Sequence, residues 1–191
     1  MENLNNKLLA AIYNGENIEK IKELIEQGAD VNAKGFGNYT PVFLAIEKEN
    51  LEVLKELIKS GANIKNNEDI KLLLNSIKKE NYQIAIELIK AGINVDLADE
   101  NGETAVFYAI RKNNLELLTE LIKAGANINK KNLDGNTPLI IASQLNLKEI
   151  FEEIIKARPD VNLQGAGGKT ALHLAVENEN YEMVKLLLRI K

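Results

Sequence analysis

The stretch GANINKKNLDGNTPL, residues 125–139, lies between two segments with strong helical periodicity. Gly125 follows the last periodic residue of the first segment and can take the left-handed conformation that ends a helix. The residues at 132–135, NLDG, have the composition of a tight turn. Thr137 is suited to cap the next helix, and Pro138 suits its first position, where a missing N–H costs nothing. The stretch therefore predicts a helix end, a turn and a helix start in close succession.

The same elements recur along the chain. Thr104, Thr137 and Thr170 are each 33 residues apart, and a glycine stands two residues before each of them. The closing motif of the stretch recurs as GADVN (28–32), GANI (61–64), GINV (92–95) and GANIN (125–129). Two short periodic apolar segments lie between these marks, for example TAVFYAIRK (104–112) and LELLTELIKA (115–124). The repeating unit is therefore a turn-rich hairpin, a helix, a short turn and a second helix.

Neither predicted helix of the unit exceeds about ten residues, and isolated helices shorter than ~12–15 residues are marginal in water. One unit alone cannot bury its apolar faces. The units must therefore stack on one another, which gives a quasi-one-dimensional solenoid.

The chain resembles ankyrin repeat proteins at these residues. The segments DENGETAVFYA (99–109), NLDGNTPLIIA (132–142) and GAGGKTALHLA (165–175) match the first half of that family's motif, and GADVNAK (28–34) matches the second half. The resemblance covers the whole chain. It implies an all-α repeat solenoid of helix-turn-helix units with short β-hairpin or loop fingers, whose tips and first helices line a concave face.

We expect a single ankyrin repeat domain over residues 1–191. Its six units are placed at 1–33 (the N-terminal cap), 34–66, 67–97, 98–130, 131–163 and 164–191 (the C-terminal cap).

Two units depart from the pattern. The third is two residues short and lacks the Gly-x-Thr-Pro motif, so we expect a blunted or missing hairpin at 64–70, although neutral variation is the alternative reading. The fifth has Arg158-Pro159 in place of Gly-Ala. Because Arg takes the left-handed conformation less readily than Gly, we expect its second helix to end one or two residues early.

The bulk properties exclude several classes of function. The net charge is −4 and the pI about 5.3, so no overall positive field indicates nucleic-acid binding. The absence of cysteine excludes disulfides and Cys-ligated zinc and fits a reducing compartment. The first 20 residues lack the basic start of a signal peptide, and no segment approaches the ~20 apolar residues of a membrane span. We therefore expect a cytoplasmic protein, with a nuclear or secreted-effector location as the alternative.

Nothing in the sequence indicates catalysis, a metal or a cofactor. His173 is the only histidine and has no Cys or second His to act with. It stands at the family's motif His, whose role in that family is to hydrogen-bond backbone across neighbouring hairpins. The glycines at 165–168 lack the Lys-Ser/Thr of a phosphate-binding loop. Asn32, Asn129 and Asn162 close the Gly-Ala-Asp-Val-Asn motif, and we expect their side chains to fasten the turn.

The candidate binding residues are those that we expect the fold not to need, at the hairpin tips and at the exposed ends of the first helices. They are Phe36, Tyr39, Lys78, Lys79, Glu100, Asn101, Glu103, Arg111, Lys112, Leu133, Asp134, Asn136, Gln144 and Leu145. Phe36, Tyr39 and Leu133 are the expected anchors. The cations at 78, 79, 111 and 112 form a basic strip, which Glu47 and Glu80 partly neutralise; simple solvation is the alternative reading.

The first hypothesis for the function is a non-catalytic protein–protein interaction module or scaffold, whose concave face binds a protein partner with an acidic segment. Charge reversal at Lys79, Arg111 and Lys112 should then weaken binding without a change in thermal stability.

Two alternatives remain open. The basic strip could bind nucleic acid or an anionic small ligand, although the overall acidity and the lack of stacking aromatics disfavour nucleic acid. Leu186 and Leu188 make the C-terminal cap apolar, so weak dimerisation is the alternative to a monomer. We expect no membrane partner.

Overall fold

The computed structural model describes residues 3–64 and 70–190, and these residues form α-helices and short turns without a β-strand. The chain divides into two compact halves, Met1–Ile93 and Asn94–Lys191. The N-terminal half contains α1 (Leu4–Asn14), α2 (Ile18–Glu26), α3 (Pro41–Glu47), α4 (Leu51–Lys59), α5 (Ile70–Lys78) and α6 (Tyr82–Lys90). The C-terminal half contains α7 (Ala105–Arg111), α8 (Leu115–Lys123), α9 (Pro138–Gln144), α10 (Lys148–Lys156), α11 (Ala171–Glu177) and α12 (Tyr181–Arg189).

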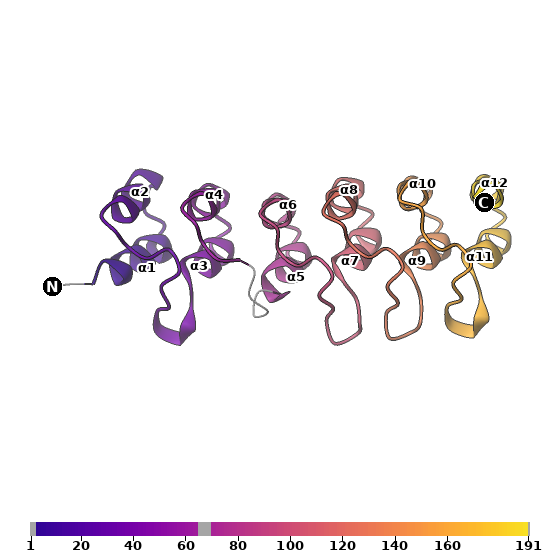
Figure 1. The fold of residues 1–191 in the computed structure, drawn as a ribbon, viewed down its shortest axis with the longest axis horizontal. Coiled ribbons are helices and arrows are strands. Elements are labelled where there is room, and N and C mark those ends of the chain that lie inside the picture. The colour runs from indigo at the N-terminus through magenta and orange to yellow at the C-terminus, as the bar shows by residue number, and fades with distance from the viewer. Residues whose placement is uncertain (1–2, 65–69, 191) are drawn as a thin grey trace. The chain divides into compact units, whose positions relative to one another are not determined.

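Each half is a stack of antiparallel helix pairs in two layers (Figure 1). In the N-terminal half, the first helices α1, α3 and α5 pack in one layer and the second helices α2, α4 and α6 in the other. In the C-terminal half, α7, α9 and α11 form one layer and α8, α10 and α12 the other. The predicted all-α repeat solenoid is therefore confirmed.

Local sequence signals set the helix boundaries. Thr40 and Thr137 cap α3 and α9, each by accepting a hydrogen bond from a backbone N–H of the first turn, and a proline follows each of them as predicted. Asn50 and Asn114 cap the second helices α4 and α8 in the same way. The turn between the two helices of each repeat has one left-handed residue: Gly15, Glu49, Glu80, Asn113, Asn146 and Glu179.

Apolar side chains fill the space between the two helical layers. In the C-terminal half, Phe107 of α7, Phe151 of α10 and three leucines of α8 are completely buried; the leucines are Leu117, Leu118 and Leu121. In the N-terminal half, Leu54 and Leu57 of α4 are completely buried in the equivalent way. Since each helix is short, this burial between neighbours stabilises the helices.

The expected hairpins are loops, which we call fingers and define as residues 35–39, 99–103, 132–136 and 165–169. One backbone hydrogen bond closes each finger, for example from the Asn132 N–H to the Asn136 carbonyl at 3.0 Å. Two fingers contain a single 3-10 turn, η1 (Phe36–Asn38) and η3 (Ala166–Gly168). A single hydrogen bond between the two ends of a finger is too few to form a pair of β-strands. The predicted blunting at 64–70 falls on residues 65–69, which lie outside the described residues.

The prediction for the fifth repeat was wrong. Helix α10 ends at Lys156, two residues before Arg158, just as α8 ends at Lys123, two residues before Gly125. Arg158 takes the left-handed conformation with φ 57°. The packing of the repeat therefore overrides the backbone preference of arginine, which is worth only ~1–2 kcal/mol.

Among the residues that the structure describes, no helix has the length and the apolar composition needed to cross a membrane.

Candidate binding surface

The fingers of the C-terminal half lie side by side (Figure 1) and are joined by hydrogen bonds from backbone N–H groups. The Leu133 N–H donates a hydrogen bond to the Asn101 carbonyl of the preceding finger at 3.0 Å. The Ala166 N–H donates to a side-chain oxygen of the preceding finger, the Asn136 Oδ1, at 3.0 Å. Gly102 permits this approach, because a Cβ there would lie 2.9 Å from the Leu133 nitrogen. The fingers at 132–136 and 165–169 are thus each positioned by the finger before them.

A second series of bonds joins the bases of the repeats. The Asn129 Oδ1 accepts a hydrogen bond from the Asp160 N–H at 2.9 Å, and the Asn32 Oδ1 accepts one from the Asn63 N–H at 2.6 Å. The Asp96 carboxylate accepts one from the Asn127 N–H at 2.8 Å. The expectation that these asparagines fasten their own turn was wrong for Asn32 and Asn129, because their side chains accept from the turn of the next repeat and so connect two repeats. Within each turn, the backbone N–H of the asparagine donates to the side chain two residues earlier: Asn32 to Asp30, Asn129 to Asn127 and Asn162 to Asp160.

The finger tips expose large apolar side chains. Phe36 is fully exposed and Leu133, at the equivalent position of another finger, is 77% exposed. Tyr39 and Leu145 are also exposed large apolar residues. The polar candidates Glu100, Asn101, Asp134 and Gln144 are exposed as well. These side chains are available to a partner without disturbing the core.

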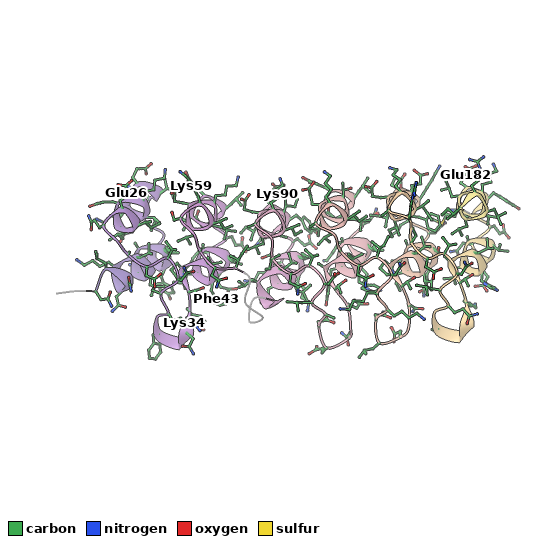
Figure 2. The ribbon with its side chains drawn as sticks, viewed as in Figure 1. Glu26, Lys34, Phe43, Lys59, Lys90 and Glu182 are labelled. Atoms are coloured by element: carbon green, nitrogen blue, oxygen red, sulfur yellow. The ribbon has the colours of Figure 1, made fainter. Side chains whose placement is uncertain are left out.

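A groove of about 710 Å³ lies between α1 and the first finger of the N-terminal half. Helix α1 contributes Asn6, Leu9, Ala10, Tyr13 and Asn14; the finger region contributes Lys34, Gly35, Phe36 and Tyr39; and α3 contributes Leu44. Figure 2 shows Lys34 at this finger and Phe43 on the neighbouring helix.

Ring contacts fix two aromatic side chains of this groove. The Tyr39 ring stacks on Phe43 with centroids 4.6 Å apart, and the Lys48 Nζ lies 4.0 Å from the centroid of the Tyr13 ring. Such rings lose little conformational entropy when they bind a partner, because their rotamers are already held.

The candidates Glu103, Arg111 and Asn136 have structural partners, so the expectation that the fold does not need them was wrong. Glu103 is only 8% exposed, and the Arg111 Nη2 lies 2.6 Å from its Oε1. The hydrogen bond that Arg111 donates to the Glu103 carboxylate raises the pKa of the Arg111 guanidinium. Asn136 holds the next finger through Ala166. The low exposure of Glu103 arises from tertiary packing, which the local sequence does not show.

Two cations of the predicted basic strip lie in each half of the chain. In the N-terminal half, the Lys79 Nζ lies 3.0 Å from the Glu47 Oε1, which agrees with the expected neutralisation. Lys78 is exposed at the end of α5. In the C-terminal half, Lys112 is exposed beside Arg111, which is paired with Glu103. The net positive charge that these residues present is therefore small.

The histidine of the last repeat is exposed and bonded within its own repeat. The Thr170 N–H donates to the His173 Nδ1 at 3.3 Å, which organises the first turn of α11. The corresponding Phe107 and Ile140 are buried and Phe43 is half-buried, so the position mainly serves packing. Within the described residues, no three His, Asp or Glu side chains are grouped so as to hold a metal ion.

Sequence reasoning missed the groove as a unit. Leu9, Ala10 and Lys34 were not among the candidates, because an apolar stripe on a short helix normally indicates core packing. The available signal was the spacing of Asn6, Leu9 or Ala10, and Tyr13 on α1.

Comparisons with known proteins agree with this architecture. The chain matches a family model that describes three copies of the ankyrin repeat. The matched residues are 3–68, 50–132, 73–165 and 112–191. An ankyrin repeat domain from Acinetobacter baumannii is 28% identical with a TM-score of 0.76, and the alignment covers 95% of this chain and 96% of that one. No match was found among curated proteins.

A second solved structure, of a predatory endopeptidase from Bdellovibrio bacteriovorus in complex with an immunity protein, contains a similar chain. That chain is 31% identical with a TM-score of 0.66, and the alignment covers 100% of this chain and 99% of the other.

Proposed function

The chain belongs to the ankyrin repeat family, and from this membership we propose that it is a non-catalytic module that binds a partner protein with its finger tips and first helices. One observation carries the proposal: Phe36 and Leu133 expose large apolar side chains at equivalent positions of two fingers. Exposed apolar residues on a rigid frame, surrounded by polar residues, are typical of binding hot spots.

The architecture supports this role, because the residues that stabilise the fold differ from those that are exposed to a partner. Helix packing and the bonds between repeats use the buried residues and the motif asparagines. The exposed finger-tip side chains make no contribution to that core. We place the six repeats in one domain with the boundaries given above, in a reducing compartment such as the cytoplasm.

Two further observations support a binding role over chemistry. The lone histidine organises the start of α11, and the Asp99 carboxylate is occupied by the Tyr108 hydroxyl at 2.6 Å and by the backbone N–H groups of its finger. The similar chain from Bdellovibrio bacteriovorus comes from the structure of a protein–protein complex. Ankyrin repeats are also generic protein-interaction modules.

The alternative of nucleic-acid or anionic small-ligand binding by the basic strip has less support. Lys79 and Arg111 lie against Glu47 and Glu103. Because binding to nucleic acid depends on cations that neutralise phosphates, these pairs weaken such an interaction.

Self-assembly through the C-terminal cap is the second candidate function, and exposed apolar residues favour it. Leu188 is 69% exposed on α12, and Tyr181 of α12 and Val176 of α11 are also exposed. Sedimentation over a range of protein concentrations tests it. Association that Leu188→Ser abolishes supports this function, and a monomer at every concentration rejects it.

A peptide selection tests the main proposal. A random peptide library displayed on phage is selected on the immobilised chain, and the binders are then measured against two variants. The finger variant carries Phe36→Ser and Leu133→Ser. The control variant carries Lys59→Ser and Lys90→Ser on the second helices α4 and α6, where Figure 2 labels both lysines. We expect at least a tenfold loss of affinity for the finger variant, about 1.4 kcal/mol, and no loss for the control. The reverse pattern contradicts the proposal.

A further inference from the structure

Leu133 has an exposed side chain on a backbone that hydrogen bonds hold in place. The side chain is 77% exposed. Its N–H donates to the Asn101 carbonyl of the preceding finger at 3.0 Å, and the Asn132 N–H closes the finger by donating to the Asn136 carbonyl at 3.0 Å. The Asn132 Oδ1 accepts a further bond from the Asn136 N–H at 3.0 Å. A partner that covers Leu133 therefore buries apolar surface without having to order the finger, which favours binding.

A carboxylate lies on each side of this leucine. Asp134 follows Leu133 directly, and Glu100 precedes Asn101, whose carbonyl accepts the Leu133 hydrogen bond. The side chains of Glu100 and Asp134 are both exposed. Across the described ranges 3–64 and 70–190, neither carboxylate takes part in a hydrogen bond or a close ion pair. Leu133 is therefore flanked by two carboxylates that are open to a cationic group.

The charged residues of these two fingers are all acidic. Residues 99–103 and 132–136 contain carboxylates at positions 99, 100, 103 and 134 and no lysine or arginine. Arg111 of α7 interacts electrostatically with Asp134, but its Nη2 lies 2.6 Å from the Glu103 Oε1. The Lys130 Nζ donates to the Asp96 carbonyl at 2.6 Å. The other nearby cations in the sequence lie outside the two fingers, at Lys112 and Lys131. The finger tips themselves are therefore negative, as is the whole chain with its net charge of −4.

We propose that the fingers 99–103 and 132–136 bind a basic segment of a partner protein, in which an apolar side chain lies between two lysines or arginines. The apolar side chain packs on Leu133, and the cations face Glu100 and Asp134. The charge of this segment is opposite to the one that the basic strip predicts, because Lys79 and Arg111 are paired within the chain. The inference rests on the proposed binding function and specifies the site and the chemistry of its ligand.

The apolar and the charged contacts have different roles. Contact with Leu133 contributes most of the affinity, because it removes a large exposed apolar side chain from water. The carboxylates determine the preference for basic over acidic segments. Since exposed ion pairs are weak and are screened by salt, each should change the affinity by only a few-fold. A peptide of a few residues should bind with a Kd on the order of 1 mM, because it is not preorganised.

Four acetylated peptide amides test the proposal by NMR titration of the ¹⁵N-labelled full chain at low salt. They have the sequences SKLKNGS, SQLQNGS, SELENGS and SKAKNGS, so that the charge and the apolar side chain vary separately. We expect SKLKNGS to shift the amide signals of residues 99–103 and 132–136. The glutamine and alanine peptides should each bind about fivefold more weakly, and the glutamate peptide should bind at least tenfold more weakly.

Protein variants locate the site. The finger variant, Glu100→Gln with Asp134→Asn, should remove the preference for SKLKNGS over SQLQNGS. The control variant, Glu116→Gln with Glu149→Gln, makes the same change in net charge on the exposed surface of the second helices α8 and α10, and it should keep the preference. Leu133→Ser should remove the preference for SKLKNGS over SKAKNGS. Because each comparison pairs a protein change with a peptide change, it reports the contact itself. Circular dichroism checks that all three variants fold.

Three results would overturn the inference. The first is an absence of shifts at the two fingers with SKLKNGS at millimolar concentration, and the second is equal or tighter binding of SELENGS. The third is a loss of the charge preference in the control variant as large as in the finger variant, since binding would then follow the net charge of the chain. If binders from the phage selection lose affinity for Leu133→Ser and keep it for the variant with Glu100→Gln and Asp134→Asn, the proposed function stands and the basic ligand is rejected.

Discussion

Arg111 and Glu103 form an ion pair within one repeat of the C-terminal half. The Arg111 Nη2 lies 2.6 Å from the Glu103 Oε1, and its Nε lies 3.2 Å from both carboxylate oxygens. The Glu103 side chain is only 11% exposed and also receives a long hydrogen bond from Asn132 at 3.4 Å. Arg111, which the sequence predicts to bind a partner, therefore forms an ion pair with a nearly buried carboxylate of its own repeat.

Removal of this cation should destabilise the fold. Arg111→Ala leaves the Glu103 carboxylate with only its weak bond to Asn132, so we expect the free energy of unfolding to fall by about 1–3 kcal/mol. Lys131→Ala, at an exposed position of the same half, should change it by less than about 0.5 kcal/mol. Urea denaturation followed by circular dichroism measures both. Equal stability of the two variants would show that the pair is not structural.

The contact between fingers predicts different effects at two equivalent glycines. Gly102 and Gly135 both have positive φ, 72° and 80°, but only at Gly102 would a Cβ meet backbone, 2.9 Å from the Leu133 nitrogen. Both alanine variants carry the left-handed penalty of about 1 kcal/mol. Gly102→Ala should cost at least about 1 kcal/mol more, because the neighbouring finger must move. Thermal denaturation of the two variants gives the comparison, and equal melting temperatures would contradict the close packing of these fingers.

The bonds between repeats can be tested in the same motif. Asn129→Ala removes the acceptor of the Asp160 N–H and should lower the free energy of unfolding by about 1 kcal/mol. Asn162→Ala changes the same motif position one repeat later, where the side chain accepts no backbone hydrogen bond among the described residues. It should be close to neutral. A larger loss in Asn162→Ala than in Asn129→Ala would argue against this role of the asparagines.

Arg158 offers a stabilising change. Its φ of 57° is unfavourable for a residue with a side chain, so Arg158→Gly should raise the free energy of unfolding by about 0.5–1 kcal/mol after the greater freedom of glycine in the unfolded chain is counted. Arg158→Ala keeps the strain and serves as the control. Chemical denaturation of the three proteins measures the difference, and no gain for glycine over alanine would mean that position 158 is relaxed.

The repeat architecture could be predicted from the sequence because its signals are local. The threonine–proline helix starts at Thr40 and Thr137 and the glycines after α2, α4, α6 and α8 depend on the residue and its immediate neighbours. The left-handed Arg158 could not be predicted, since packing between repeats outweighs a preference of ~1–2 kcal/mol.

The candidate surface could be predicted in part. Phe36 and Leu133 were found because the motif identifies which finger residues the helices do not use. The burial of Glu103 and its contact with Arg111 depend on how the first helix folds back on its own finger. The groove beside Tyr13 depends on α1 and the next finger together. Local periodicity contains neither piece of information.

The central claim is that fingers and first helices bind a partner, while packing between helices supplies stability. An amide chemical-shift map of the ¹⁵N-labelled chain with a peptide from the phage selection tests it most directly. We predict that the largest changes fall on the fingers, residues 35–39, 99–103, 132–136 and 165–169, and on the first helices that carry them. Changes concentrated on the second helices α2, α4, α8 and α10 would contradict the account.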